Sequence, residues 1–180
     1  IAAGLQTYEA SGLRQNIYEQ DGYQIYADCY NASPDAMEAT LAVLGTMAPE
    51  GRRFAVLGSM LELGGYAEEG HRRAGRAAAR YADALYAYGP DADAMVAGAK
   101  EKGMDRSYAF ADQAALVAAL RQDAKKGDAL LFKGSRGMRM EQALKLFLGE
   151  DVEDVPYIHL NRPTIGRFER YAVAALCASI

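Results

Sequence analysis

Short apolar runs alternate with longer amphipathic segments along most of the chain. The apolar runs are bounded by turn-forming residues and are typical of strands, whereas the segments between them carry apolar residues at helical spacing. The predicted strands span 16–18, 23–30, 53–58, 84–88, 107–110 and 128–132. The predicted helices span 34–48, 67–82, 91–102, 112–122 and 138–148. This alternation predicts an α/β fold with a mostly parallel sheet that helices cover on both faces.

Local signals support two of these boundaries. Asp21-Gly22 separates the first two strands and is a strong signal for a two-residue hairpin. Ser33 is a good N-cap residue, and Pro34 follows it at the first position of a helix, where proline is favoured. We expect this helix to continue until Pro49 ends it.

The two ends of the chain depart from the alternation. Residues 1–13 look like the end of a helix that runs into a linker, and an acidic patch precedes a further predicted helix at 165–178. Because the chain begins with Ile1 and not with methionine, we expect it to be a piece of a longer protein. We predict three parts: the end of a preceding domain with its linker at 1–15, one α/β domain at 16–149, and an extension of unknown role at 150–180.

Composition narrows the function classes. The chain has 180 residues, a net charge of −4, and 51% hydrophobic against 24% charged residues. This balance argues against disorder, and the mild acidity argues against nucleic-acid binding. We expect no membrane span, because no stretch approaches the ~20 apolar residues that a span needs. The two cysteines, Cys29 and Cys177, are too few for a disulfide framework and favour a reducing compartment such as the cytoplasm.

Three loops that follow predicted strands are rich in polar and glycine residues. They lie at 28–33, 58–65 and 133–139. In a parallel sheet the loops after the strands share one edge, which is where ligands bind in open α/β folds. The third loop also holds Lys133, Arg136 and Arg139 at the start of a predicted helix, a combination that favours anion binding.

Less specific interpretations stay open for each loop. Asp28 and Asn31 could simply organise a turn and cap a helix, the glycines of the second loop could mark turns, and the third loop could be a solvated basic surface. The chain has no P-loop or GxGxxG string, and His71 and His159 lie in no metal-ligand pattern, so we expect no metal site. We expect Cys29 to be a packed thiol and His71 to lie on the surface.

Three strings, in this order and spacing, resemble motifs of the C-terminal domain of the Mur ligases. They are DCYNASPDAM at 28–37, RFAVLGSMLELG at 53–64 and LFKGSRGMRME at 131–141. The similarity covers about residues 1–149 and implies the family's Rossmann-like, three-layer fold. Three residues depart from the family pattern: Ser59 and Ala27 stand where aspartate is usual or frequent, and Ser33 replaces an asparagine. We expect Ser59 to weaken either a hydrogen bond that orders its loop or a polar contact.

The resemblance implies part of an ATP-dependent amide ligase of peptidoglycan synthesis, from the branch that adds D-alanyl-D-alanine to UDP-N-acetylmuramoyl-tripeptide. Such enzymes activate a carboxylate as an acyl phosphate, which the amine of the dipeptide then attacks. The family's P-loop, magnesium ligands and UDP-sugar-binding domain have no counterpart in these 180 residues, so ATP and Mg²⁺ would be held mainly by other domains. We therefore expect the chain alone to be inactive, with at most weak affinity for nucleotide or dipeptide.

The resemblance also assigns roles to individual residues. Arg14 matches a linker arginine that reaches the nucleotide phosphates, where its charge would assist phosphoryl transfer. The loop that contacts the rest of the nucleotide is matched by Asp28, Tyr30 and Asn31. The loop near the dipeptide and the reaction centre is matched by Lys133, Ser135 and Arg136. Lys133, like Arg14, is assigned to catalysis.

Two other functions stay open on the sequence. The first is a free-standing α/β domain that binds a nucleotide or a small anion without ligase activity. The second is a structural or interaction domain that uses residues 150–180 as a docking element. A P-loop in the gene upstream of Ile1 would favour the ligase, whereas a start codon beside Ile1 would favour the first alternative.

Overall fold

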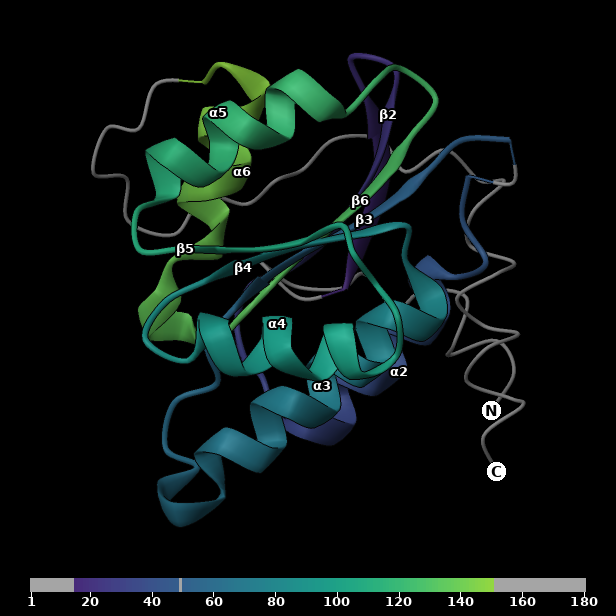
Figure 1. Cartoon of the computed structure of the whole chain (residues 1–180). Coiled ribbons are helices and arrows are strands. Elements are labelled where there is room, and N and C mark those ends of the chain that lie inside the picture. The colour runs from purple at the N-terminus through teal and green to yellow at the C-terminus, as the bar shows by residue number, and fades with distance from the viewer. Residues whose placement is uncertain (1–14, 49, 151–180) are drawn as a thin grey trace, which may run out of the picture.

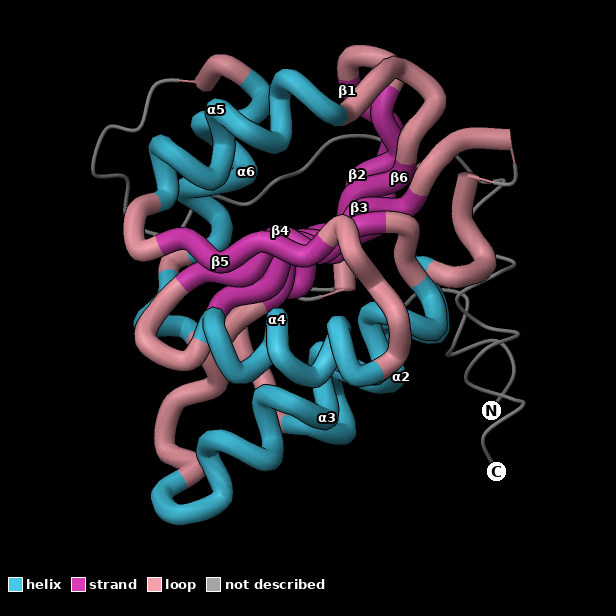
Figure 2. Tube along the Cα trace, viewed as in Figure 1, coloured by secondary structure: helices cyan, strands magenta, loops and turns pink. Residues whose placement is uncertain are grey.

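The computed structural model describes residues 15–48 and 50–150. Within them, six strands form one sheet in the order β1-β2-β6-β3-β4-β5 (Figures 1 and 2). The strands are β1 Asn16–Gln20, β2 Tyr23–Asp28, β3 Arg53–Gly58, β4 Ala84–Tyr88, β5 Ser107–Phe110 and β6 Ala129–Lys133. The pair β1–β2 is antiparallel, and all other neighbours are parallel, which confirms the predicted mostly parallel sheet.

Helices cover both faces of the sheet, so the domain has three layers (Figure 1). The helices are α2 Pro34–Leu44, α3 Ala67–Tyr81, α4 Ala92–Glu101, α5 Gln113–Asp123 and α6 Met140–Leu148, with short 3₁₀ helices η1 Gly64–Tyr66 and η2 Arg136–Met138. Buried side chains of α2, α3 and α4 pack on one face, and those of α5 and α6 pack on the other. The chain moves outward from β2 through β3, β4 and β5 and then returns to β6. Right-handed crossovers therefore place α5 on the opposite face from the earlier helices.

The hairpin and the first helix start as their local signals predict. Asp21 and Gly22 have positive φ angles of 54° and 86°, as a tight hairpin turn between twisted strands requires. Ser33 Oγ accepts a hydrogen bond from Ala36 N at 3.2 Å, so the serine caps α2 as expected. The predicted end of this helix at residue 48 is wrong, because α2 ends at Leu44. Gly45 N still donates to the carbonyl oxygen of Leu41, four residues back, but the N–H groups of Thr46 and Met47 donate to carbonyls only three residues back, which closes the helix before position 49.

Two glycines allow α3 and α4 to pack at very short range. A Cβ atom added at Gly75 would lie 1.9 Å from the carbonyl oxygen of Met95, and one added at Gly98 would lie 2.0 Å from that of Arg72. Neither contact is sterically allowed for a real side chain. The small residues thus set how closely the two helices approach on this face of the sheet.

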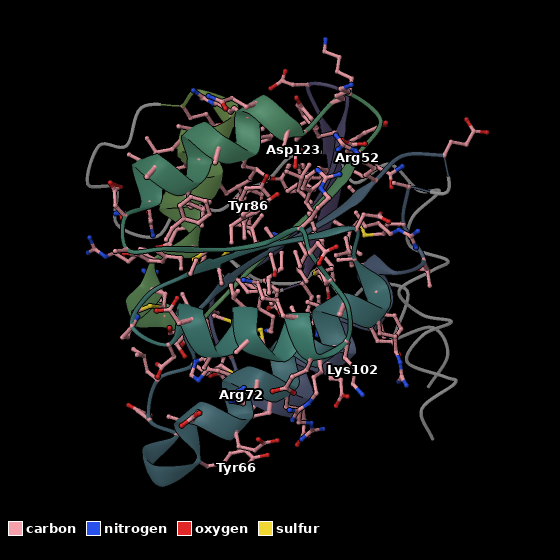
Figure 3. The ribbon with its side chains drawn as sticks, in the orientation of Figure 1. Arg52, Tyr66, Arg72, Tyr86, Lys102 and Asp123 are labelled. Carbon is pink, nitrogen blue, oxygen red and sulfur yellow. The ribbon has the colours of Figure 1, made fainter. Side chains whose placement is uncertain are left out.

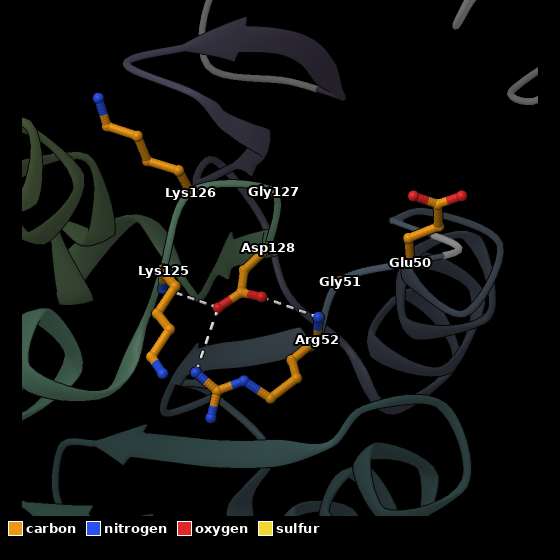
Figure 4. A pocket seen from close by; sticks show the side chains of 7 residues that line it. All are labelled: Glu50, Gly51, Arg52, Lys125, Lys126, Gly127 and Asp128. Carbon is orange, nitrogen blue, oxygen red and sulfur yellow. Dashed lines mark hydrogen bonds and ion pairs between the residues drawn. The ribbon is translucent and has the colours of Figure 1, made fainter.

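An open hollow lies at the amino ends of β3 and β6 (Figure 4). At its floor, the buried Asp128 carboxylate accepts hydrogen bonds from Arg52 N at 2.9 Å, Lys125 N at 2.7 Å and Arg52 Nη2 at 3.3 Å. The side chains of Glu50 and Lys126 extend away from the hollow (Figure 4). The carboxylate therefore joins the two chain segments that lead into neighbouring strands, which is a structural role.

Arg52 also reaches a cluster under α5 that contains Asp123 and Tyr86 (Figure 3). Tyr86 Oη donates to Asp123 Oδ2 at 2.9 Å, and the guanidinium groups of Arg52 and Arg106 pair with the same carboxyl. Burial alone would raise the pKa of Asp123, but these hydrogen bonds outweigh it and lower the pKa. The cluster ties α5 to β3, β4 and the segment before β5.

Candidate functional site

The carboxyl ends of β2, β6 and β3 lie side by side at one edge of the sheet. The helix after β6 packs on one face, whereas the helices after β2 and β3 pack on the other. Loops that leave neighbouring strands toward opposite faces open a crevice, and this is the usual ligand position in α/β sheets. The predicted meeting of the loops at 28–33, 58–65 and 133–139 is therefore confirmed.

Lys133 connects the first and third of these loops. It is in register with Asp28 on the neighbouring strand, so both side chains point to the same face of the sheet. Lys133 Nζ donates to Asp28 Oδ2 at 2.5 Å and to the backbone oxygen of Asn31 at 2.8 Å. Only 1% of Lys133 and 7% of Asp28 are exposed. The ammonium charge is thus balanced inside the protein and is not displayed on the loop surface.

The β2–α2 loop combines buried and exposed groups. Asn31 is exposed, and its Oδ1 accepts from Ala32 N at 2.9 Å, so the turn-organising interpretation of this residue has a structural basis. Tyr30 beside it is half-buried. Cys29 is fully buried and donates to the carbonyl oxygen of Phe132 at 3.4 Å. Its burial confirms the predicted packed thiol. Burial also raises the pKa of the Cys29 thiol, and nearby carboxylates raise it further.

The β6–α6 loop is tied to the β3–α3 loop by Ser135. Its Oγ accepts from Leu61 N at 2.9 Å, and its backbone N–H donates to the backbone carbonyl oxygen of Ser59 at 3.3 Å. Arg136 is exposed and forms an ion pair with Glu141 at the start of α6. Arg139 is also exposed and has a positive φ of 49°. The predicted basic loop therefore divides into a buried lysine, a buried connecting serine and two exposed arginines.

His71 contradicts the prediction that it lies on the surface, because it is completely buried. Its Nε2 accepts from Met60 N at 2.8 Å, and its Nδ1 lies 2.6 Å from the carbonyl oxygen of Ala67. An Nε2 atom that accepts from a backbone N–H carries no proton, so we assign the proton to Nδ1. His71, Ala74 and Ala78 share one buried side of α3, and this helical spacing was the signal that could have revealed it.

Comparison with known proteins identifies the family of this chain. The sequence model of the family "Mur ligase, glutamate ligase domain" matches residues 14–136. The chain belongs to the Mur ligase family. It is 35% identical over 147 residues to the UDP-N-acetylmuramoyl-tripeptide–D-alanyl-D-alanine ligase of Bacillus subtilis, covering 80% of this chain and 32% of that protein. The protein of the same name from Treponema pallidum is 40% identical over 118 residues, which cover 64% of this chain and 25% of the Treponema protein.

Solved structures of this Mur ligase type share the fold. The ligase MurF of Thermotoga maritima, solved in complex with ADP, has a TM-score of 0.69 and 31% identity over 80% of this chain and 32% of its own. MurF of Acinetobacter baumannii has a TM-score of 0.74 and 28% identity over 82% of this chain and 33% of its own. The predicted Rossmann-like, three-layer fold is thereby confirmed. The chain spans about a third of the length of the first relatives it matches.

The structure also bears on one departure expected from the sequence motifs. Ser59, which the resemblance places where an aspartate is usual, is fully buried, and its Oγ accepts from Asp91 N at 3.0 Å. It also donates to the carbonyl oxygen of Tyr88 at 3.4 Å. The serine thus makes hydrogen bonds that hold its loop against the loop after β4. Beyond it the β3–α3 loop projects outward, with Leu61 39% and Tyr66 47% exposed (Figure 3).

Several predictions fall on residues outside 15–48 and 50–150. These are the roles of Arg14 and the 1–13 linker and the nature of the extension from residue 151, which includes His159 and Cys177. Among the residues that the structure describes, no group of three or more histidine, cysteine or carboxylate side chains could hold a metal ion. Nor does any helix in these ranges have the length and apolar character to cross a membrane.

Proposed function

We propose that the chain is the C-terminal domain of an ATP-dependent ligase that joins D-alanyl-D-alanine to UDP-N-acetylmuramoyl-tripeptide. The relatives that match most of its length carry this name. The observation that carries the proposal is the meeting of all three family motifs at one sheet edge, joined by the Lys133–Asp28 and Ser135–Leu61 hydrogen bonds. Motifs that lie far apart in the sequence thus form a single continuous surface beside the crevice.

The reaction we propose has two steps. The γ-phosphoryl group of ATP passes to the terminal carboxylate of the tripeptide, which gives ADP and an acyl phosphate. The amine of the dipeptide then attacks the acyl carbon, an amide bond forms, and inorganic phosphate leaves. Both steps build up negative charge around the phosphoryl group, and cations placed beside it lower the barrier. ATP with its Mg²⁺ would be bound mainly by parts of the ligase outside this chain. We propose that the reaction takes place in the cytoplasm.

We assign two of the three loops at this edge, 28–33 and 133–139, to different substrates. The exposed Asn31, with the half-buried Tyr30, would contact the nucleotide, and Arg14 would reach its phosphates. Asp28 would contribute to nucleotide binding by holding this loop, because it is buried and paired with Lys133. Ser135 and the exposed Arg136 would lie nearest the dipeptide, whose carboxylate is a natural partner for a guanidinium group. Lys133 shares the loop of these residues, but its buried position favours an indirect contribution to catalysis.

We propose that the domain spans residues 16–149. Within 15–48 and 50–150, the strands and helices run from Asn16 to Leu148 and all fall inside this range. Residues 1–15 would then be the end of the preceding domain with its linker, and residues 150–180 an extension of unknown role. None of the 180 residues forms a P-loop string, so we expect the isolated chain to form no amide.

The test is amide formation by the longer protein that contains this chain. Purified protein is incubated with ATP, Mg²⁺, UDP-N-acetylmuramoyl-tripeptide and D-alanyl-D-alanine, and ADP and the pentapeptide product are measured together. The proposal expects ADP formation that depends on both substrates and falls sharply when L-alanyl-L-alanine replaces the D,D-dipeptide. ATP hydrolysis without dependence on the dipeptide, or preference for a single amino acid as the amine, would contradict it.

A further inference from the structure

Lys133 is one of the most deeply buried large side chains among the described residues, alongside Phe54 and Phe132. A charged group in such a place is stable only when partners replace its lost hydration. Lys133 has two such partners, the Asp28 carboxylate at 2.5 Å and the Asn31 carbonyl oxygen at 2.8 Å. Two of its three N–H groups are therefore already directed to protein acceptors.

The two acceptors lie on either side of one short segment. Asp28 is the last residue of β2, and Asn31 lies three positions further, in the loop that leads into α2. A single ammonium group thus holds both the beginning and the middle of this loop against the end of β6. Its position fixes the backbone that carries the exposed Asn31 side chain.

The surroundings strengthen this contact. Burial raises the pKa of Tyr26 and of Cys29, and the Asp28 carboxylate raises both further, as expected where water is largely excluded. An ion pair in such a region is strongly directional, because neither charge can turn to solvent. A dipeptide carboxylate could reach the ammonium only by displacing Asp28 from a site that is 7% exposed.

We propose that Lys133 is a positioning residue, which fixes the Asp28–Ser33 loop for nucleotide binding and does not touch the dipeptide. This proposal rests on the ligase function proposed above. It separates two residues of one motif: Lys133 acts on the nucleotide side through Asp28 and Asn31, whereas Arg136, three positions later and exposed, acts on the dipeptide side. If Lys133 were purely structural, its substitution would lower the amount of folded enzyme but would not change KM for ATP relative to KM for D-alanyl-D-alanine.

The kinetic test uses the longer ligase with K133M and, as the matched variant from the same loop, R136M. K133M is expected to raise KM for ATP at least ~10-fold and to leave KM for D-alanyl-D-alanine within ~2-fold. R136M is expected to show the reverse pattern. In K133M, an increase in KM for the dipeptide with an unchanged KM for ATP would overturn the proposal. A fall in kcat with both KM values unchanged would also overturn it.

A comparison in the D28N background keeps the test valid if K133M alone folds poorly, because it needs only D28N and D28N/K133M. The D28N/K133M pair removes both charges, so no buried ion is left unpaired. Because Lys133 acts partly through Asp28, its effect on KM for ATP should shrink to less than ~3-fold in the D28N background. An undiminished effect would show that Lys133 acts on the nucleotide by another route and would overturn the proposal.

Hydrogen exchange on the 180-residue chain separates the two proposals. If Lys133 restrains the loop, K133M should speed amide exchange at residues 29–33 by at least ~10-fold, while residues 84–88 of β4 stay protected. Unchanged exchange at 29–33 would overturn the positioning role even if the ligase is active. An inactive unsubstituted ligase would instead refute the proposed function, and the exchange data would still decide whether Lys133 holds the loop.

Discussion

His71 offers a sharp test of how the β3–α3 loop is anchored. Two substitutions separate the two hydrogen bonds of its ring, because the amide of glutamine reaches about as far as Nε2 and that of asparagine about as far as Nδ1. H71Q can still accept from Met60 N but loses the donor to the Ala67 oxygen. H71N keeps a donor for Ala67 and loses the acceptor for Met60.

The structure predicts which variant is less stable. Met60 is 1% exposed, so its N–H would have no water to replace the lost acceptor, and an unpaired buried donor costs about 1–3 kcal/mol. Ala67 is only half-buried, so water can reach its carbonyl, and the loss is nearer to the ~0.5–1.5 kcal/mol of an ordinary hydrogen bond. Both variants lose the ring, and asparagine is also one buried CH₂ smaller than glutamine, which adds ~0.8 kcal/mol in the same direction. We therefore expect H71N to be less stable than H71Q by about 1–2 kcal/mol, and a difference below ~0.8 kcal/mol would leave nothing for the Met60 contact.

Urea unfolding of the 180-residue chain measures this difference directly. The urea midpoints of H71N and H71Q are compared only if the two variants have the same slope of unfolding free energy against urea concentration. A different slope would indicate that a substitution has changed the unfolded state. Equal stability of the two variants would show that the Met60 contact contributes little. The opposite order would show that the Ala67 contact is the stronger one, or that Nε2 carries the proton. In that tautomer the acceptor that the described residues place nearest along this direction is Asp91 Oδ2, at 3.7 Å, which is too long for a hydrogen bond.

Two further predictions concern stability. Gly75→Ala would normally stabilise a helix by up to ~1 kcal/mol, but here the new Cβ meets the Met95 oxygen at 1.9 Å, so we expect a loss of about 1–3 kcal/mol in urea unfolding. Gly65→Ala, whose Cβ meets nothing within 4 Å, is the control and should stay within ~0.5 kcal/mol. The lowered pKa of Asp123 contributes stability above the unfolded pKa of about 3.9, which is lost as pH falls through the lower folded pKa. Asp123→Asn should therefore unfold more easily than the unsubstituted chain at pH 7, and a gap of the same size at pH 3 would contradict the argument.

Local chemistry made much of the fold predictable. The Asp21-Gly22 turn and the Ser33 cap depend on residues within a few positions of each other, and both are found where the sequence placed them. The central strands β3, β4 and β6 were also recognisable, since each is a short, largely apolar run with nearly every residue buried. The end of α2 was misplaced because Pro49 is a strong stop signal, whereas the chain had already left the helix after Leu44.

The site was predictable as a place but not as a set of contacts. That the three loops share one edge follows from parallel strands alone. That Lys133 meets Asp28 depends on β6 lying between β2 and β3 and on its register, which join residues 105 positions apart. Sequence spacing carries no information on such a pairing. For the same reason Lys133 was interpreted as one of the cations of an anion-binding loop, although its ammonium group is buried and paired with Asp28.

The central claim, that the carboxyl edge of the sheet is the working face, is tested most directly by substituting the two edges of the sheet in the longer ligase. Asn31→Ala and Arg136→Ala alter exposed residues at the carboxyl edge, and Lys125→Ala/Lys126→Ala alters exposed residues at the amino edge, beside the hollow of Figure 4. The quantity measured is kcat/KM for amide formation with each substrate. We predict a loss of at least ~10-fold for each carboxyl-edge variant and less than ~2-fold for the amino-edge variant. A comparable loss from the amino edge, or none from the carboxyl edge, would contradict the account.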